Sequence, residues 1–325
     1  MNEFLVLDAE TANLRWRERF AGRPPPAYAM FSTLLNGIVT DPAWMVMPTD
    51  EHLVHRGDGV FETIRCVAGA LYAVPAHLER LERSAGAIAL RVPMASGELT
   101  AAMVATVRAG GRPDATVRLI AARGPGGFGV NPYDSPEAQV YIVAYPSGTP
   151  FMRGHPRGAR VRTSAVPMKP GAMATAKTCN YIPNALMKKE AVDAGVDFTV
   201  TFDERGGLGE GATENMAIVD AAGRLRLPPP ERILAGITMQ RMAELAARDP
   251  SRCGLRGVEI GPIFRRDIET AREMLVFGTT VEVASVVEWD GRPIGRGRPG
   301  PVGAALGRWL EDDMRNNDDW RTPVF

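Results

Sequence analysis

Apolar positions follow two different periods along the chain. In the segment 75–89, Leu78, Leu81, Ala85 and Ile88 recur at helical spacing, which predicts a helix with one buried face. Shorter apolar runs bounded by Gly, Pro, Asn and Asp are typical of strands. Further helices are predicted at 96–109, 182–194, 238–248, 268–271 and 301–314. Strands or strand pairs are predicted at 32–39, 44–48, 59–74, 116–122, 138–145, 159–166, 196–202, 217–230 and 274–287.

The order of these elements predicts an α/β protein of the α+β kind, with two domains. Residues 31–145 form a small domain and residues 159–325 a large one. The stretch 146–158, with three Pro and three Gly, is the predicted interdomain linker.

Residues 1–30 look like an appended N-terminal arm. Helical character over 8–20 ends at Arg-Pro-Pro-Pro, residues 23–26, because proline lacks a backbone donor and disfavours helix in the residue before it. Two interpretations stay open at this point. The arm packs on the body or on a partner subunit, or it is a disordered tail.

Composition narrows the class of function. The 325 residues are enough for two cores, and 38 basic residues balance 38 acidic ones, so no field favours nucleic acid or an anionic membrane. The three cysteines do not form the pattern of a disulfide framework. The acidic N-terminus is unlike a signal peptide, and no apolar run reaches membrane-spanning length. We expect a cytoplasmic enzyme of small molecules.

The stretch 177–215 holds the candidate chemistry. Lys177 lies on a short polar loop, Tyr181 follows four residues later, and Glu210 lies at a glycine-rich turn. An amine, a phenol and a carboxylate at the edges of regular elements suit a lysine that forms a Schiff base with an aldehyde cofactor. A lone lysine of this kind is more often a surface residue before an ordinary helix, so the interpretation depends on further motifs.

Four such motifs accompany K-T-C-N-Y (177–181) in a fixed order. They are H-R-G-D-G-V-F-E-T-I-R (55–65), A-H-L-E-R-L (76–81), L-A-G-I-T (234–238) and F-G-T-T-V-E (277–282). Together they resemble the class IV aminotransferases, pyridoxal-phosphate enzymes of fold type IV. This family includes branched-chain aminotransferases, D-amino-acid aminotransferases and aminodeoxychorismate lyases. L-N-G-I-V-T-D-P, V-P-M-K-P and N-Y-I-P-N are most similar to plant members of the lyase/D-aminotransferase type.

The resemblance implies a fold type IV homodimer with pyridoxal 5'-phosphate between the two domains. It makes Lys177 the catalytic lysine, Glu210 the partner of the pyridine nitrogen, and Tyr181 a donor to the phenolic oxygen. Glu214, the rival carboxylate, receives a structural part. The free N–H groups at the start of the predicted helix near Thr238 suit a phosphate. The implied cofactor-binding residues are Arg80, Lys177, Tyr181, Glu210, Ile237, Thr238 and Thr279.

The reaction is the least determined point. We favour transfer of an amino group between an amino acid, branched-chain or D, and a 2-keto acid over the lyase reaction that makes 4-aminobenzoate and pyruvate. Arg56 is the residue on which the alternative depends, because a cation at the pocket mouth could hold a second carboxylate, although it could instead pair with Asp58 or Glu62. The candidate substrate-binding residues are Arg56, Phe61, Arg118, Gly127, Phe128 and Thr280.

Two other interpretations lack support. G-P-G-G-F-G (124–129) matches a dinucleotide fingerprint literally, but the prolines that follow prevent the helix that would hold a pyrophosphate. The four histidines lack metal-ligand spacing, so no metal site is predicted.

Overall fold

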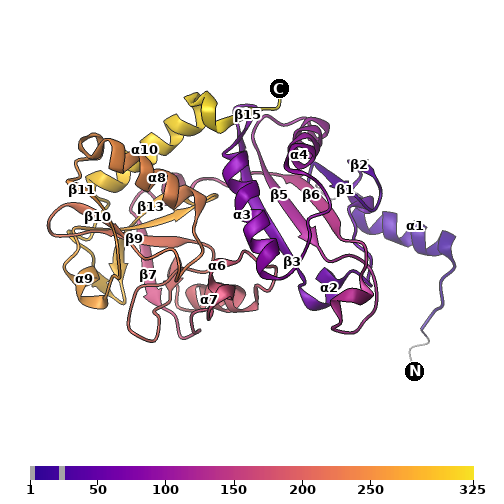
Figure 1. Cartoon of the computed structure of the whole chain (residues 1–325), viewed down its shortest axis with the longest axis horizontal. Coiled ribbons are helices and arrows are strands. Elements are labelled where there is room, and N and C mark those ends of the chain that lie inside the picture. Colours follow the sequence, from indigo (N-terminus) through magenta and orange to yellow (C-terminus); the bar gives the residue numbers. More distant parts are fainter. Residues whose placement is uncertain (1–3, 22–25) are drawn as a thin grey trace.

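The computed structural model describes residues 4–21 and 26–325 and contains two β-sheets side by side (Figure 1). The first sheet is antiparallel throughout, in the order β15-β4-β3-β5-β6-β1-β2. Its strands are β1 (Ala29–Ser32), β2 (Gly37–Val39), β3 (Gly59–Val67), β4 (Ala70–Tyr72), β5 (Ala115–Ala122), β6 (Gln139–Tyr145) and β15 (Arg321–Pro323).

The second sheet is mixed, in the order β11-β10-β9-β12-β13-β7-β8, with β14 paired to β13. The pairs β10–β11, β13–β7 and β7–β8 are parallel. Its strands are β7 (Ala159–Thr163), β8 (Phe198–Val200), β9 (Asn215–Val219), β10 (Arg224–Leu227), β11 (Gly257–Ile260), β12 (Glu273–Gly278), β13 (Glu282–Trp289) and β14 (Arg292–Pro293). The two sheets with the helices that cover them confirm the predicted α+β class.

Helices cover these sheets or lie at their ends. They are α1 (Ala9–Phe20), α2 (His52–Arg56), α3 (Val74–Ala87), α4 (Ser96–Gly110), α5 (Phe151–Gly154), α6 (Ala172–Thr175), α7 (Ile182–Asp193), α8 (Ile237–Arg248), α9 (Arg265–Glu269) and α10 (Pro301–Asn316). Short 3₁₀ turns span Pro42–Trp44, Pro132–Asp134, Pro250–Cys253 and Asp318–Trp320. Figure 1 shows α3 on the side of the first sheet that faces the second.

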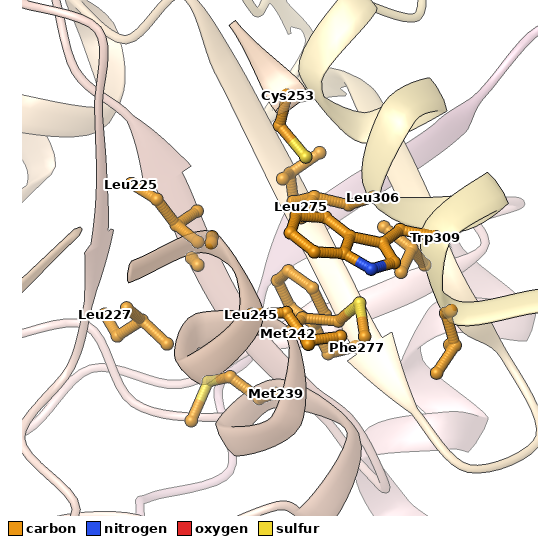
Figure 2. Packing of buried hydrophobic residues seen from close by; sticks show 14 of the residues in the cluster. Leu225, Leu227, Met239, Met242, Leu245, Cys253, Leu275, Phe277, Leu306 and Trp309 are labelled. Carbon is orange, nitrogen blue, oxygen red and sulfur yellow. The ribbon is translucent and has the colours of Figure 1, made fainter. Parts of the chain in front are cut away.

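The second sheet is buried on both faces because its central strands alternate apolar side chains between two cores. Leu275 and Phe277 of β12 pack under α8 and α10, whereas Met274 and Val276 face the other core. Figure 2 shows the first of these cores, where side chains of α8 and α10 meet over the sheet. This burial on both faces explains why β12 is apolar from Met274 to Phe277.

One predicted strand is wrong. The residues 44–48 were expected to be extended, but Pro42–Trp44 form a 3₁₀ turn and 45–48 join no strand. Asp41 caps that turn by accepting a hydrogen bond from the Ala43 N–H at 3.0 Å. An aspartate cap followed by proline at the first position starts a helical turn, and this outweighs the apolar pattern that follows.

The two chain ends attach to the first sheet's side of the molecule. α1 has no buried residue and contacts the body through Trp16, whose indole N–H donates to the Ala43 carbonyl at 2.6 Å. Most of the proline run expected to end this helix lies outside the described residues. At the other end, β15 pairs with β4 and Val324 is fully buried, so the last strand joins the first sheet.

Candidate active site

Lys177 lies in a short segment that runs beside β3, between the two sheets. The Phe61 N–H donates to the Lys177 carbonyl at 3.0 Å, and the Cys179 N–H donates to the Gly59 carbonyl at 2.8 Å. On its other side, the Lys177 N–H donates to the Ser84 hydroxyl of α3 at 3.0 Å. Three backbone hydrogen bonds therefore fix the lysine against the first sheet.

The Lys177 amine lies among aromatic rings. Its Nζ is 3.4 Å from the Tyr181 hydroxyl and 4.7 Å from the centre of the Phe61 ring. Burial, reinforced by the positive charge of Arg80, lowers the pKa of Lys177 to about 8. At pH 7 about one tenth of such an amine is uncharged, a far larger fraction than for an ordinary lysine, and the uncharged form is the one that a nucleophile or proton acceptor requires.

Phe61 connects this amine to Arg118. The Phe61 ring meets Tyr181 edge-on at 5.0 Å, and the Arg118 guanidinium lies 4.6 Å from the centre of the Phe61 ring. Arg118 donates to the Tyr145 hydroxyl at 3.4 Å, while its buried Nε has no acceptor in the described part of the chain. A guanidinium with an unused donor next to the amine can receive a carboxylate.

Glu210 lies at the turn that leads into β9. The Leu234 N–H donates to its Oε2 at 3.0 Å, and no donor to Oε1 occurs among residues 4–21 and 26–325. Burial raises the pKa of Glu210, with Lys169 and Lys177 opposing that rise. Glu214 differs, because its carboxylate accepts from the Thr213 N–H at 2.9 Å and from the Thr213 hydroxyl. Glu210 is therefore the carboxylate with an oxygen left to accept a ligand proton.

Arg80 is held by buried partners. Its Nε and Nη2 donate to both oxygens of Glu62 at 2.8 and 2.6 Å, and Nη1 donates to the Ala235 carbonyl at 3.0 Å. His77 Nδ1 lies 2.7 Å from the same carboxylate, which is completely buried. The guanidinium holds the pKa of Glu62 at about 2 against the effect of burial. Arg80 is thereby fixed beside the start of α8.

The start of α8 is suited to an anion. Its N-cap residue, Gly236, supplies no capping side chain, so the N–H groups of the first turn, including those of Ile237 and Thr238, are available. A side chain at Gly236 would overlap Asn215, whose Oδ1 occupies the space that an added Cβ needs. Thr279 and Thr280 lie in the tight turn between β12 and β13.

A second group of predicted residues gathers elsewhere. Arg56 donates to the Phe128 carbonyl at 2.6 Å and to the Gly129 carbonyl at 3.2 Å, and Phe128 packs on His55. Within the residues described, Arg56, Gly127 and Phe128 make no hydrogen bond or ring contact with Lys177, Tyr181 or Glu210. The loop 124–131 leads into a 3₁₀ turn rather than a helix.

The suggested pairing of Arg56 with Asp58 or Glu62 is wrong. The Asp58 carboxylate pairs instead with Arg123 Nε at 3.0 Å and with His52 Nδ1 at 2.8 Å. The Glu62 carboxylate is hydrogen-bonded to Arg80 and His77. The nearby loop carbonyls satisfy Arg56 instead.

Four residues of the site escaped the sequence analysis. Glu62 and His77 position Arg80, Ser84 anchors the Lys177 backbone, and Lys169 lines a pocket together with Glu210. Glu62, His77 and Lys169 lie inside the quoted motifs, so the motifs contained the signal. The sequence did not show that Glu62 pairs with Arg80, because the two residues are 18 residues apart on different elements.

The described residues contain neither a metal-binding cluster nor a membrane-spanning helix. No three His, Cys, Asp or Glu side chains gather there as a metal site. Across the same residues, no helix is both long and apolar enough to cross a bilayer.

Comparison with known proteins gives concordant matches. The model of the family described as amino-transferase class IV matches residues 59–289. The D-amino-acid transaminase of Arabidopsis thaliana chloroplasts is 34% identical over 289 residues, covering 89% of this chain and 77% of the relative. A putative branched-chain-amino-acid aminotransferase of Methanocaldococcus jannaschii is 32% identical, covering 86% and 94%.

Solved structures agree with these relatives. A branched-chain amino acid aminotransferase of the organism abbreviated T.th., solved with pyridoxamine 5'-phosphate, superimposes with a TM-score of 0.84 at 30% identity, covering 92% of this chain and 99% of that one. The same enzyme complexed with N-(5'-phosphopyridoxyl)-L-glutamate gives a TM-score of 0.83 at 29% identity. The matches in sequence and in fold confirm the resemblance carried by the motifs, and the chain belongs to the class IV aminotransferases, a family of pyridoxal-phosphate enzymes.

Proposed function

We propose that this aminotransferase moves an amino group between a branched-chain or D-amino acid and a 2-keto acid in the pocket formed by Lys177, Tyr181 and Glu210. The observation that carries the proposal is that the Lys177 amine and the Glu210 carboxylate offer opposite proton-transfer properties. One side presents an amine of lowered pKa, and the other presents a half-buried carboxylate with an oxygen that lacks a donor in the described chain. Such a pair suits proton transfer next to an electron-withdrawing ring.

The residues fit pyridoxal phosphate at each of its polar groups. When bound, the cofactor supplies an aldehyde that condenses with amines and a pyridinium ring that withdraws electrons. We assign Lys177 to the aldehyde, Tyr181 to the phenolic oxygen and Glu210 to the pyridine nitrogen. For the phosphate we assign the uncapped start of α8, with Arg80 fixed beside it. Thr279, in the turn between β12 and β13, completes the proposed set.

Four side chains of the protein then have separate roles. Lys177, with its lowered pKa, accepts a proton from the substrate carbon and returns one. Glu210 accepts the hydrogen bond of the ring nitrogen, and its low-polarity surroundings strengthen that interaction. Tyr181, whose pKa burial raises, stays protonated and donates. Phe61 covers the amine and excludes water from one side.

Arg118 is our candidate for the substrate carboxylate. Its guanidinium lies across the Phe61 ring from Lys177 and keeps a buried Nε–H without an acceptor in the described chain. Arg56 is less suited to this role, because the Phe128 and Gly129 carbonyls already occupy it. The lyase alternative depended on a free Arg56, and the relatives reported above are named aminotransferases, so the lyase reaction is not favoured.

We further propose a homodimer in the cytoplasm. Large apolar side chains are exposed on the first sheet's half of the molecule, which favours a covering partner. They include Leu34, Leu35, Trp44, Val54, Phe128 and Tyr133. The three cysteines are unpaired, as expected in a reducing compartment. Light scattering of the purified protein tests the dimer, since a monomeric mass contradicts it.

A half-reaction tests the proposed function. The cofactor-loaded protein is mixed with single L- and D-amino acids without an acceptor, and conversion to the pyridoxamine spectrum is followed. We expect conversion with branched-chain or D-amino acids. No conversion with any amino acid, together with 4-aminobenzoate formation from aminodeoxychorismate, would establish the lyase instead.

Peptide mapping tests the assignment of Lys177. The chain has only four lysines among 38 basic residues, so a borohydride-reduced cofactor adduct can be located by mass spectrometry. We expect the adduct on Lys177, its loss in Lys177→Ala, and its retention in Lys189→Ala, where the replaced lysine is exposed and pairs with Asp193. An adduct that persists on another lysine in Lys177→Ala would contradict the assignment.

A further inference from the structure

Lys169 is a cation near Tyr181 and Glu210 to which the proposed function gives no role. Its side chain is half-buried and lines a pocket together with Tyr181, Asn184, Glu210 and Leu234. Its Nζ lies 4.7 Å from the centre of the Tyr181 ring, while Lys177 Nζ lies 5.9 Å from the same centre. Two ammonium groups therefore share one tyrosine ring, and the proposed function uses only one of them.

The residue type at this position is informative. Of 38 basic residues only four are lysines, at 169, 177, 188 and 189. The last two are exposed on α7. A chain that uses arginine almost everywhere thus places both of its partly buried lysines beside Tyr181. Lysine is a compact point charge whose pKa responds to burial, whereas arginine stays charged and needs room for a planar fork.

The loop that carries Lys169 is fixed in position. At its start, the Ser164 N–H donates to the Val200 carbonyl at 2.9 Å, and the Ala165 N–H donates to Glu190 at 3.2 Å. Next to Lys169, the Met168 sulfur packs on Gly209, where an added Cβ would come within 2.9 Å of it. This contact places Met168, the neighbour of Lys169 in the chain, against Gly209, the residue that precedes Glu210.

The charges around Glu210 define what Lys169 does there. Lys169 and Lys177 attract the Glu210 carboxylate, Glu214 repels it, and the Leu234 N–H binds one of its oxygens. In the described chain Lys169 itself has no hydrogen-bond or ion-pair partner, and Glu210 is the charged group that acts on it. Lys177 is committed to the cofactor aldehyde under the proposed function, which leaves Lys169 as the cation available to the carboxylate.

We propose that Lys169 is a positioning residue that holds Glu210 as an anion at the end of the pocket that receives the cofactor ring. This inference rests on the proposed function of the pocket. The charge of Lys169 favours the state in which a proton shared between Glu210 and the ring nitrogen resides on the nitrogen. Lys169 lies near the Tyr181 ring and lines one pocket with Glu210. It acts on the cofactor through Glu210.

Cofactor affinity provides a test that does not depend on turnover. The dissociation constant of pyridoxal phosphate is measured from about pH 6 to about pH 8 for the wild type, Lys169→Met, Glu210→Gln and the double variant. Burial raises the pKa of Glu210, and loss of the neighbouring cation raises it further. The anion then forms only at higher pH, so Lys169→Met should bind about tenfold more weakly at the acidic end and less so at the basic end.

Two controls separate charge from packing. Lys169→Arg keeps the charge and should retain the wild-type pH profile. In the Glu210→Gln background, Lys169→Met should have no effect, because the group through which it acts is gone. The ligand's own titration is common to all proteins and cancels. An equal loss of affinity in both backgrounds, or no shift of the profile, would overturn the inference.

The outcome also distinguishes this inference from the proposed function. If borohydride attaches the cofactor to Lys177 and the two substitutions are additive, only the role of Lys169 is wrong. If no adduct forms on Lys177 but the substitutions remain non-additive, the attachment lysine is wrong while Lys169 still acts through Glu210.

Discussion

Replacing Glu62 by glutamine should destabilise the protein more than the loss of any surface charge. Glu62 is completely buried, and its two oxygens accept from Arg80 at 2.8 and 2.6 Å, with His77 Nδ1 at 2.7 Å. Glutamine removes the negative charge and turns an amide N–H₂ toward the guanidinium or the imidazole. Arg80 is then left buried without its counter-ion.

The magnitude follows from the electrostatics of the pair. The pKa of Glu62 falls from 4.5 to about 2, which corresponds to about 3 kcal/mol in favour of the ionised folded state. Breaking a buried ion pair by removing one partner typically costs about 3–5 kcal/mol. Because the folded pKa is lower than the unfolded one, this stabilisation is complete above about pH 4.5 and is lost as the pH falls toward about 2.

Urea unfolding of the cofactor-free protein at neutral pH measures the effect. The matched control is Glu79→Gln, which removes the exposed 2.6 Å pair between Glu79 and Arg83 on the same helix as Arg80. We expect a loss of about 3 kcal/mol for Glu62→Gln and under about 1 kcal/mol for the control. The wild-type advantage should shrink in acid. Equal losses for the two variants would refute the reasoning.

Two further substitutions test the cofactor site. Glu210→Gln should retain pyridoxal phosphate but lower the half-reaction rate by several orders of magnitude, since the ring nitrogen loses its anionic partner; near-normal rates in a stopped-flow assay would contradict the role. Gly236→Ala should destabilise the fold by about 1–3 kcal/mol and weaken phosphate binding, because its Cβ would overlap the Asn215 side chain. Gly86→Ala is the control, in helix α3 with no atom within 4 Å of the added Cβ, and should raise the thermal midpoint.

The sequence predicted the elements whose apolar pattern is strong. The hairpin at Ala68 and Gly69 and the long helix α10 occur where expected, since turn residues and helical spacing act locally. β15 was not predicted as a strand, because three residues carry no periodicity and their pairing with β4 depends on the completed first sheet. The 3₁₀ turn at Pro42–Trp44 was missed because its capping aspartate was outweighed by the apolar run that follows.

Side-chain partners were harder to predict than site residues. Lys177 lies 3.4 Å from the Tyr181 hydroxyl, and Tyr181 lines a pocket with Glu210; each of the three lies in a short loop at the end of a regular element. Arg56 shows the opposite case. Its acceptors are carbonyls 72 and 73 residues further along the chain, and backbone carbonyls have no signature in a sequence.

The site is built from both sheets, so its geometry depends on contacts between them. The Lys177 backbone pairs with β3 of the first sheet, whereas Glu210 is bonded to Thr201 and Leu234 of the second half. A shift of one sheet against the other would change the separation of the amine and the carboxylate.

Two buried bridges oppose such a shift. Tyr72 of β4 donates to Asp313 of α10, which also accepts two hydrogen bonds from Arg241 of α8 at 2.9 and 2.7 Å. Arg65 of β3 reaches Glu282 of β13 at 3.3 Å. Because α8 begins at the proposed phosphate site, the bridge through Arg241 ties that end of the cofactor pocket to the first sheet. These contacts between the halves therefore set the distance between the Lys177 amine and the Glu210 carboxylate.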